Sequence, residues 1–93
     1  MSELIYGWYL DAEDEVVKHV LKYYDEDLVR YSDRNVKGEC FVGALLGMSD
    51  DEGADGIELS KINDIIERNR EFFNDMQNKI KDNPKLWLFN VIY

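Results

Sequence analysis

Carboxylates are the side chains in this sequence that are most able to do chemistry, because they gather in two short segments. Residues 11–27 contain seven acids and two bases, and residues 50–58 contain five acids and no base. Each segment has a net charge of −5, the rest of the chain sums to +1, and the total is −9. Such a charge attracts cationic surfaces and repels nucleic acid and anionic membranes. We predict a positively charged protein partner and no direct contact with nucleic acid or membrane.

Calcium is the first ion to consider for residues 50–58, because it takes carboxylate and carbonyl oxygens as ligands. When Gly56 is placed at the invariant glycine of an EF-hand loop, Gly53 falls at the third position and Ile62 at the twelfth. The twelfth position needs a bidentate Glu, so the pattern fails. We predict no metal site, with weak and nonspecific binding of divalent cations as the alternative.

His19 and Cys40 are each the only residue of their kind, so together they could supply a base and a nucleophile. The spacing does not support this pairing, because His19 lies off the apolar stripe of its expected helix and Cys40 fits the core of a strand. Structural zinc sites need about four Cys or His ligands, and the glycines lack a phosphate-binding pattern. We therefore predict a protein that is not an enzyme, with no catalytic residues and no cofactor.

The hydrophobic pattern predicts six elements in the order strand, helix, strand, strand, helix, strand. We expect them at residues 3–10, 11–24, 28–32, 39–48, 57–81 and 85–93. This order in a chain of 93 residues is typical of a single ferredoxin-like α+β domain, spanning residues 1–93. Such a βαββαβ sandwich has a four-stranded antiparallel sheet with two helices on one face. Residues 25–38 are the least defined part, because the short second strand there could instead be helix or loop.

Two local features of these elements follow from residue type. Asp11 stands where the N-cap of the first helix is expected, since its carboxylate can accept from free backbone N–H groups. The segment 39–48 is nearly all apolar, which indicates a central strand, and its glycines indicate close packing on one face. Alternation places Cys40, Val42, Ala44, Leu46 and Met48 on one face and Phe41, Gly43, Leu45 and Gly47 on the other.

The expected fold brings the two acidic segments to the same end of the sheet. The turn after the first helix and the loop before the second helix both lie there, and neither contains a base. Carboxylates held together in this way repel one another, which folding stability alone does not favour. We therefore predict a partner-binding surface made of Asp25, Glu26, Asp27, Asp50, Asp51, Glu52, Asp55 and Glu58. The alternative is two solvated loops whose charge serves only solubility.

In its charge and size the chain resembles the small acidic inhibitors of phages and mobile elements, which include anti-CRISPR and anti-restriction proteins. Several of these mimic the charge of DNA on a small α+β domain. The string from Glu71 to Gln77 (EFFNDMQ) is similar to a segment near the end of a Cas9-blocking anti-CRISPR protein, and it covers seven of the 93 residues. The start of the chain, with Tyr6, Gly7 and Trp8 followed by acids, resembles some bacterial toxin-immunity proteins.

These resemblances imply a non-enzymatic inhibitor that binds a nucleic-acid-handling protein, with carboxylates standing in for phosphates. One alternative is an immunity protein that neutralises a cationic nuclease toxin. Another is a small ferredoxin-like domain that binds a ligand or forms a homodimer through its sheet. The chain has one cysteine, no signal-peptide pattern near its start and no apolar run long enough to cross a bilayer. We therefore expect a cytoplasmic location, in a bacterial cell or a phage-infected host.

Overall fold

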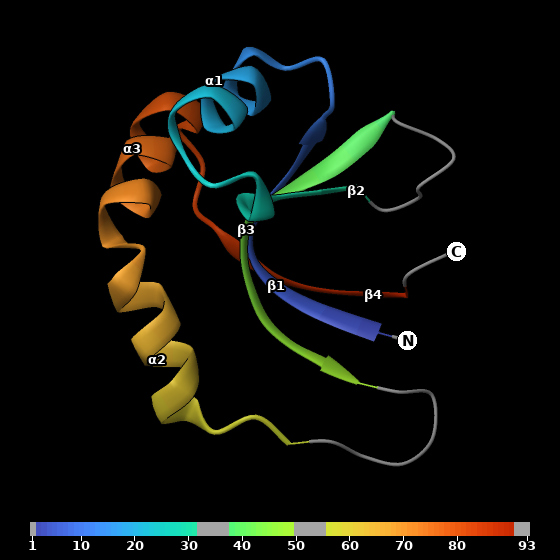
Figure 1. Cartoon of the computed structure of the whole chain (residues 1–93), viewed down its shortest axis with the longest axis vertical. Coiled ribbons are helices and arrows are strands. Elements are labelled where there is room, and N and C mark those ends of the chain that lie inside the picture. The colour runs from blue at the N-terminus through green and yellow to red at the C-terminus, as the bar shows by residue number, and fades with distance from the viewer. Residues whose placement is uncertain (1, 32–37, 50–55, 91–93) are drawn as a thin grey trace.

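The computed structural model of the chain describes residues 2–31, 38–49 and 56–90. Helices lie on one side of a curved sheet, and β3 forms an arc whose open side faces away from them (Figure 1). In chain order the elements are β1 (Ser2–Asp11), α1 (Glu15–Tyr23), the short 3-10 helix η1 (Glu26–Leu28), β2 (Val29–Tyr31), β3 (Glu39–Ser49), α2 (Leu59–Arg68), α3 (Arg70–Ile80) and β4 (Lys85–Asn90).

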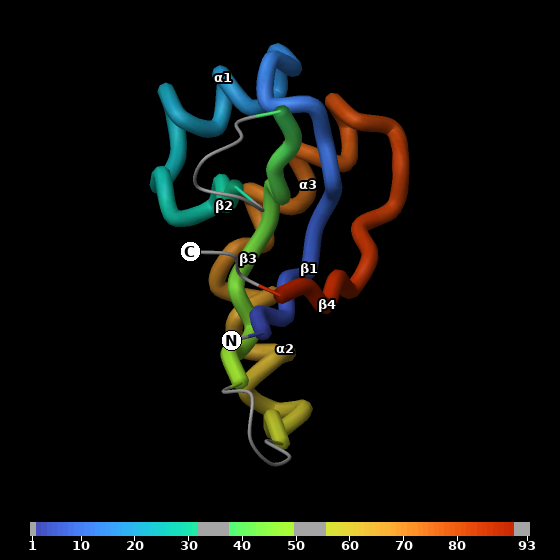
Figure 2. Tube along the Cα trace, turned by 90° about the vertical axis from the view of Figure 1, so that its right-hand side faces the viewer, coloured from blue at the N-terminus to red at the C-terminus, as the bar shows by residue number. Residues whose placement is uncertain are grey.

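The sheet has four antiparallel strands in the order β2-β3-β1-β4, which confirms the predicted α+β class with a four-stranded antiparallel sheet. β1 and β3 are the inner strands, and they lie side by side over most of their length (Figure 2). The short strand expected at residues 28–32 is confirmed, since Val29 pairs with Val42 and Tyr31 with Cys40. The central position expected for residues 39–48 is also confirmed.

The prediction of one long helix over residues 57–81 is wrong, because two α-helices occupy this segment, and the described residues form three α-helices. The interruption lies at Asn69, whose backbone has φ −109° and ψ 23°. Its side-chain amide donates to the carbonyl of Ile65 at 2.8 Å, and its backbone N–H donates to the carbonyl of Ile66. An Asn side chain that bonds to the preceding turn competes with the backbone ladder, and here it ends α2.

The first helix begins later than the sequence suggested. Asp14 is the N-cap of α1, and its carboxylate accepts from the backbone N–H of Val16 at 2.9 Å. Asp11 instead belongs to β1, and its carboxylate accepts from the N–H of Glu13 in the connecting turn. Both acids therefore satisfy backbone donors, but only Asp14 caps the helix.

The core lies between the helices and the sheet. Its members are apolar side chains from β1, β3, α1, α3 and β2: Trp8, Val17, Val20, Val29, Cys40, Val42, Ala44, Phe72, Phe73 and Met76. Met76, Val20 and Val42 are completely buried. Trp8 packs beside Phe73, and its indole N–H donates to the carbonyl of Asp82 at 2.9 Å. This bond ties the end of α3 back to β1.

A β-bulge changes the faces that the sequence assigned to the end of β3. Ile5 pairs with Leu45 and Leu4 pairs with Gly47, so Leu46 is an extra residue in β3. Leu4 and Tyr6 lie on the same face of β1, and they pair with Gly47 and Ala44. Because paired residues share a face, Gly47 lies on the face of Ala44. The prediction that Met48 shares the face of Cys40 is therefore wrong, and Met48 is exposed.

The concave side of the sheet carries a group of aromatic rings. Phe41 stacks with Tyr9 and with Phe89, at ring-centroid distances of 4.8 and 4.4 Å, and it makes an edge contact with Trp87. An ion pair joins the buried carboxylate of Glu3 on β1 to the partly exposed guanidinium of Arg30 on β2. Glu3 is 4% exposed, and among the acidic residues that the structure describes it is the one that is buried.

The inner strands approach closely where two glycines face each other. Gly7 pairs with Gly43, and a Cβ on Gly43 would lie 2.2 Å from the carbonyl oxygen of Tyr6. A Cβ on Gly7 would lie 2.1 Å from the carbonyl oxygen of Val42. The close packing expected at the glycines of residues 39–48 is therefore present, and at Gly43 the neighbour is backbone.

Candidate functional site

Four of the eight acids predicted to bind a partner lie in the part of the chain that the structure describes. These are Asp25, Glu26 and Asp27, beside η1, and Glu58, before α2. The other four fall outside the described residues: Asp50, Asp51, Glu52 and Asp55. The described part of the predicted surface therefore centres on the three acids at η1.

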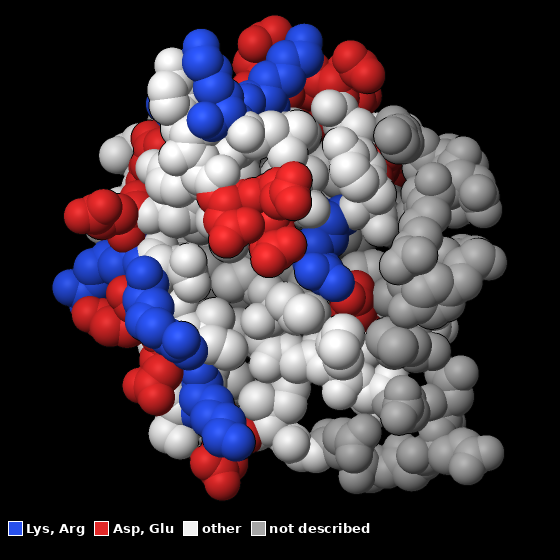
Figure 3. All heavy atoms as spheres, in the orientation of Figure 1, with Lys and Arg blue, Asp and Glu red and all other residues white. Residues whose placement is uncertain are grey.

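A local hydrogen bond fixes the first of these three carboxylates. Asp25 is the N-cap of η1, and its carboxylate accepts from the backbone N–H of Asp27 at 2.9 Å. Leu28 then packs against the core and Val29 is buried, so the acids precede an anchored segment. All three acids are exposed. Figure 3 shows a group of acidic side chains over η1, bordered mainly by uncharged residues.

Glu58 lies apart from this group. It is the N-cap residue of α2, where its side chain makes no capping hydrogen bond. β3 continues from Val42, the partner of Val29, to Ser49, which at about 3.3 Å per residue is roughly 23 Å of strand. Figure 1 shows η1 near the middle of the molecule and the start of α2 at its lower end. The structure thus unites Asp25, Glu26 and Asp27 and places Glu58 separately.

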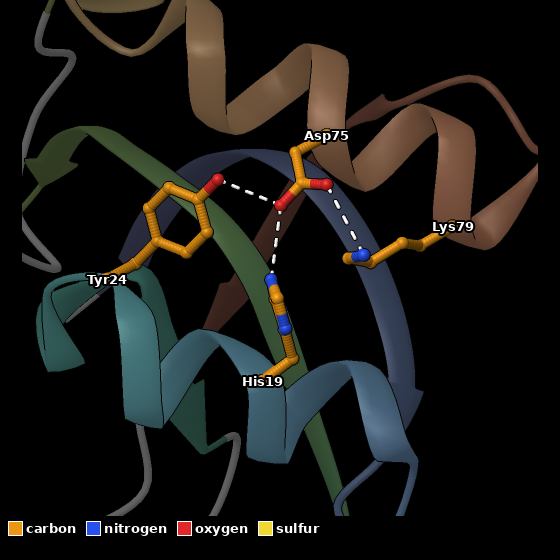
Figure 4. Close-up of polar contacts among 4 residues, drawn as sticks. All are labelled: His19, Tyr24, Asp75 and Lys79. Atoms are coloured by element: carbon orange, nitrogen blue, oxygen red, sulfur yellow. Dashed lines mark hydrogen bonds and ion pairs between the residues drawn. The ribbon is translucent and has the colours of Figure 1, made fainter.

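A second polar group connects α1 to α3 and was not predicted from the sequence (Figure 4). His19 projects from α1 and Asp75 from α3, and the ring Nε2 lies 3.1 Å from Asp75 Oδ2. The hydroxyl of Tyr24 donates to the same oxygen at 2.8 Å. Lys79, one helical turn after Asp75, places its Nζ 3.4 Å from Oδ1. One carboxylate therefore receives three partners.

The protonation states of this group follow from its geometry. The hydrogen bond from Tyr24, followed by those from His19 and Lys79, lowers the pKa of Asp75, although partial burial opposes this shift. The same hydrogen bond to Asp75 raises the pKa of Tyr24, and desolvation adds to the rise. Since an ionised carboxylate only accepts, His19 must donate through Nε2–H. Its Nδ1 has no hydrogen-bond partner among the described residues.

Sequence reasoning missed this group for a physical reason. The spacing of Asp75 and Lys79 is the i,i+4 spacing of a helical ion pair, and this signal was present. The bonds to His19 and Tyr24 span 56 and 51 positions of the chain and depend on how α1 packs against α3. Hydrophobic periodicity does not specify that packing angle.

Replacing Asp75 by Asn is expected to lower stability by about 1 kcal/mol at pH 7, because charge-assisted hydrogen bonds are lost. The folded pKa of Asp75 is depressed, so its contribution is present above its ordinary value of 3.8 and is lost as pH falls through the lowered value. Acid unfolding should therefore be less steep in Asp75→Asn than in the wild type. In NMR titrations of ¹³C-labelled tyrosine, the pKa of Tyr24 should fall toward 10.0 in this variant.

The matched control for this experiment is Asp64→Asn, an exposed acid on α2. It should leave the titration of Tyr24 unchanged. A Tyr24 titration that is the same in Asp75→Asn and in the wild type would show that the carboxylate does not hold the phenol proton.

Cys40 has no part in either group. It is completely buried in the core, and desolvation raises the pKa of its thiol to about 11. The thiolate is therefore scarce at neutral pH. Among the residues that the structure describes, no three His, Cys, Asp or Glu side chains are arranged to hold a metal ion.

The described helices are all too short or too polar to span a membrane. No protein-family model, curated protein or solved structure matches this chain significantly.

Proposed function

We propose that this protein is a non-enzymatic inhibitor that binds a cationic nucleic-acid-handling protein, of the anti-CRISPR or anti-restriction type. In this proposal the carboxylates of Asp25, Glu26 and Asp27 stand in for phosphates, and Glu58, which lies apart from them, is not part of this surface. Inhibition is steric and electrostatic, because the inhibitor occupies the groove that nucleic acid would fill. We place this activity in the cytoplasm of a bacterial cell or a phage-infected host.

One observation carries the proposal: three consecutive exposed acids lack a basic partner within residues 2–31, 38–49 and 56–90. Other acids of the described chain do have partners, since Glu15 lies near Lys18 and Glu67 near Arg70. Two like charges 4 Å apart repel by about 1 kcal/mol even in water. A cationic partner removes this repulsion and associates faster at low salt.

The anchoring of η1 also supports binding. Asp25 is held by its own capping bond, and Leu28 and Val29 fix the segment against the core. A surface that is already ordered loses little conformational entropy when a partner binds. The acids at η1 therefore suit recognition better than acids on an unanchored chain.

We also propose that the fold is of the ferredoxin-like class. β1 and β2 are both antiparallel to β3, which lies between them, and β3 and β4 are both antiparallel to β1. Two interleaved β-helix-β units of this kind support a split βαβ arrangement. In this assignment α2 and α3 together take the place of one helix.

The proposed function is tested by reversing Glu26 and Asp27 to Lys while Asp25 is kept as the cap. Tagged wild type and variant are used to capture proteins from bacterial lysate at low and at high salt, followed by mass spectrometry. We expect the wild type to retain a nucleic-acid-binding protein at low salt, with weaker retention at high salt. The variant should fail to capture this partner. The purified partner, bound to labelled DNA, should release the DNA when the wild-type inhibitor is added.

The matched control reverses two acids away from η1, Glu13→Lys and Asp64→Lys, which gives the same change in net charge. Capture of the same protein by the control, but not by Glu26→Lys/Asp27→Lys, identifies the η1 acids as the contact. Equal capture by all three proteins would contradict the proposal. A captured nuclease toxin would instead indicate an immunity protein.

A further inference from the structure

A groove between α1 and α3 has the opposite charge character to the rest of the molecule. Its volume is about 510 Å³, and it is lined by Glu15, Val16, Lys18, His19, Lys22 and Lys79. Volumes of roughly 300–1,000 Å³ are usual for small-molecule sites. Figure 3 shows basic side chains, with acidic ones beside them, at the top of the molecule, where Figure 1 places α1. Three lysines thus line one groove of a protein with a net charge of −9.

The ammonium groups in this groove are only partly neutralised. Lys18 Nζ lies 3.5 Å from Glu15, and Lys79 Nζ lies 3.4 Å from Asp75, so each makes one long ion pair. Lys22 has no carboxylate partner in the described chain, and its Nζ lies 5.2 Å from the centre of the Tyr23 ring. Each ammonium has three donors, so donors remain for an added anion.

His19 supplies a fixed group on the same wall. Its Nε2–H is committed to Asp75, and Figure 4 shows the second ring nitrogen on the side away from that carboxylate. Nδ1 has no partner in the described chain. It can accept from a protonated phosphate or, in the imidazolium form, donate to an ionised one. The hydrogen bond to Asp75 holds the ring in place for either role.

We propose that the groove between α1 and α3 binds the phosphate monoester or pyrophosphate group of a small molecule, through Lys18, Lys22, Lys79 and His19. A compact dianion can lie between ammonium groups from two helices, which a flat surface would not allow. At physiological ionic strength, charges beyond about 8 Å are largely screened. The two acids at the groove itself, Glu15 and Asp75, are each paired with one of its lysines. The site is separate from the acidic surface at η1 and does not depend on the proposed inhibitor function.

The experiment titrates inorganic pyrophosphate into ¹⁵N-labelled protein and follows the ring nitrogens of His19 by NMR. We expect a saturable shift with half-saturation below about 1 mM. In Lys22→Gln/Lys79→Gln the half-saturation should rise about tenfold, because two charge-assisted contacts are removed. The matched control is Lys61→Gln/Lys85→Gln, which removes two lysines outside the groove and should bind pyrophosphate as the wild type does.

Shifts that stay linear, or that are equal in both double variants, would overturn the proposal. A single-stranded oligonucleotide forms a second arm of the experiment, since each phosphodiester carries only one charge. It should leave the His19 signals unshifted, and tighter binding of the oligonucleotide than of pyrophosphate would overturn the assignment to a small molecule. If the Lys22/Lys79 variant does not fold, Lys22→Gln alone gives the same test, because Lys22 makes no ion pair with the residues that the structure describes.

Discussion

Replacing Arg30 by Met is expected to lower the free energy of unfolding by about 3–5 kcal/mol, because it leaves a buried carboxylate without its partner. Glu3 is 4% exposed and pairs with Arg30 across the concave side of the sheet. The Arg30 Nε is buried and has no hydrogen-bond partner in the described chain, so the pair is already incompletely satisfied. Urea denaturation of the variant and the wild type measures the loss.

The double variant Glu3→Met/Arg30→Met tests the cause of this loss. Removing both charges also removes the desolvation cost, so stability should return to within about 1 kcal/mol of the wild type. Arg70→Met is the matched control, since it breaks the pair with Glu67 at 2.7 Å, where both side chains are exposed. That change should cost under about 1 kcal/mol. A double variant as unstable as Arg30→Met would show that the arginine acts through packing.

Replacing Gly43 by Ala is expected to lower the free energy of unfolding by about 3 kcal/mol or more, which exceeds the effect of most single substitutions. The new Cβ would lie 2.2 Å from the carbonyl oxygen of Tyr6 and 2.8 Å from the Cα of Gly7. Both neighbours are backbone atoms of the adjacent inner strand, so the strands must separate locally. Thermal and urea unfolding measure the effect, and Gly7→Ala should act in the same way.

Two other glycines provide graded controls. At Gly47 the nearest atom to a new Cβ is the terminal Cδ1 of Ile57, which can move, so Gly47→Ala should cost less than Gly43→Ala. Apart from the chain neighbours of Gly56, no atom of the described residues lies within 4 Å of a Cβ placed on it, and Gly56→Ala should change stability by less than about 0.5 kcal/mol. Equal effects at Gly43 and Gly56 would mean that the inner strands separate at little cost.

Alternating and continuous apolar runs were enough to predict the strands, because burial on a sheet imposes that pattern directly. They could not locate the break at Asn69, since apolar residues continue at helical spacing on both sides, from Ile65 and Ile66 to Phe72 and Phe73. Only the bond that the Asn69 side chain makes to Ile65 distinguishes one helix from two. The bulge was hidden for a similar reason, because glycine or apolar residues fill both faces of β3 near Leu46.

The candidate site was predictable in composition but not in geometry. Exposure of Asp25, Glu26 and Asp27 follows from their charge and from the turn chemistry of Asp25. We expected these acids to lie near Glu58, which would require β2 and β3 to have similar lengths. β2 has only three residues and β3 has eleven, so the acids before β2 lie far from Glu58, which follows β3 in the chain. Strand length reflects where pairing ends in the folded sheet, which the residues of β2 alone do not determine.

The two tryptophans lie on opposite sides of the sheet, and this gives the protein a pair of internal optical reporters. Trp8 is 3% exposed and packs on the helix side against Phe73, while Trp87 is partly exposed on the concave side, beside Tyr9 and Phe41. Each indole N–H already donates to a backbone carbonyl, at Asp82 and at Gly7. With Trp87 replaced by Phe, the remaining fluorescence follows the packing of α3 on the sheet. With Trp8 replaced by Phe, it follows events on the concave side, without any attached label.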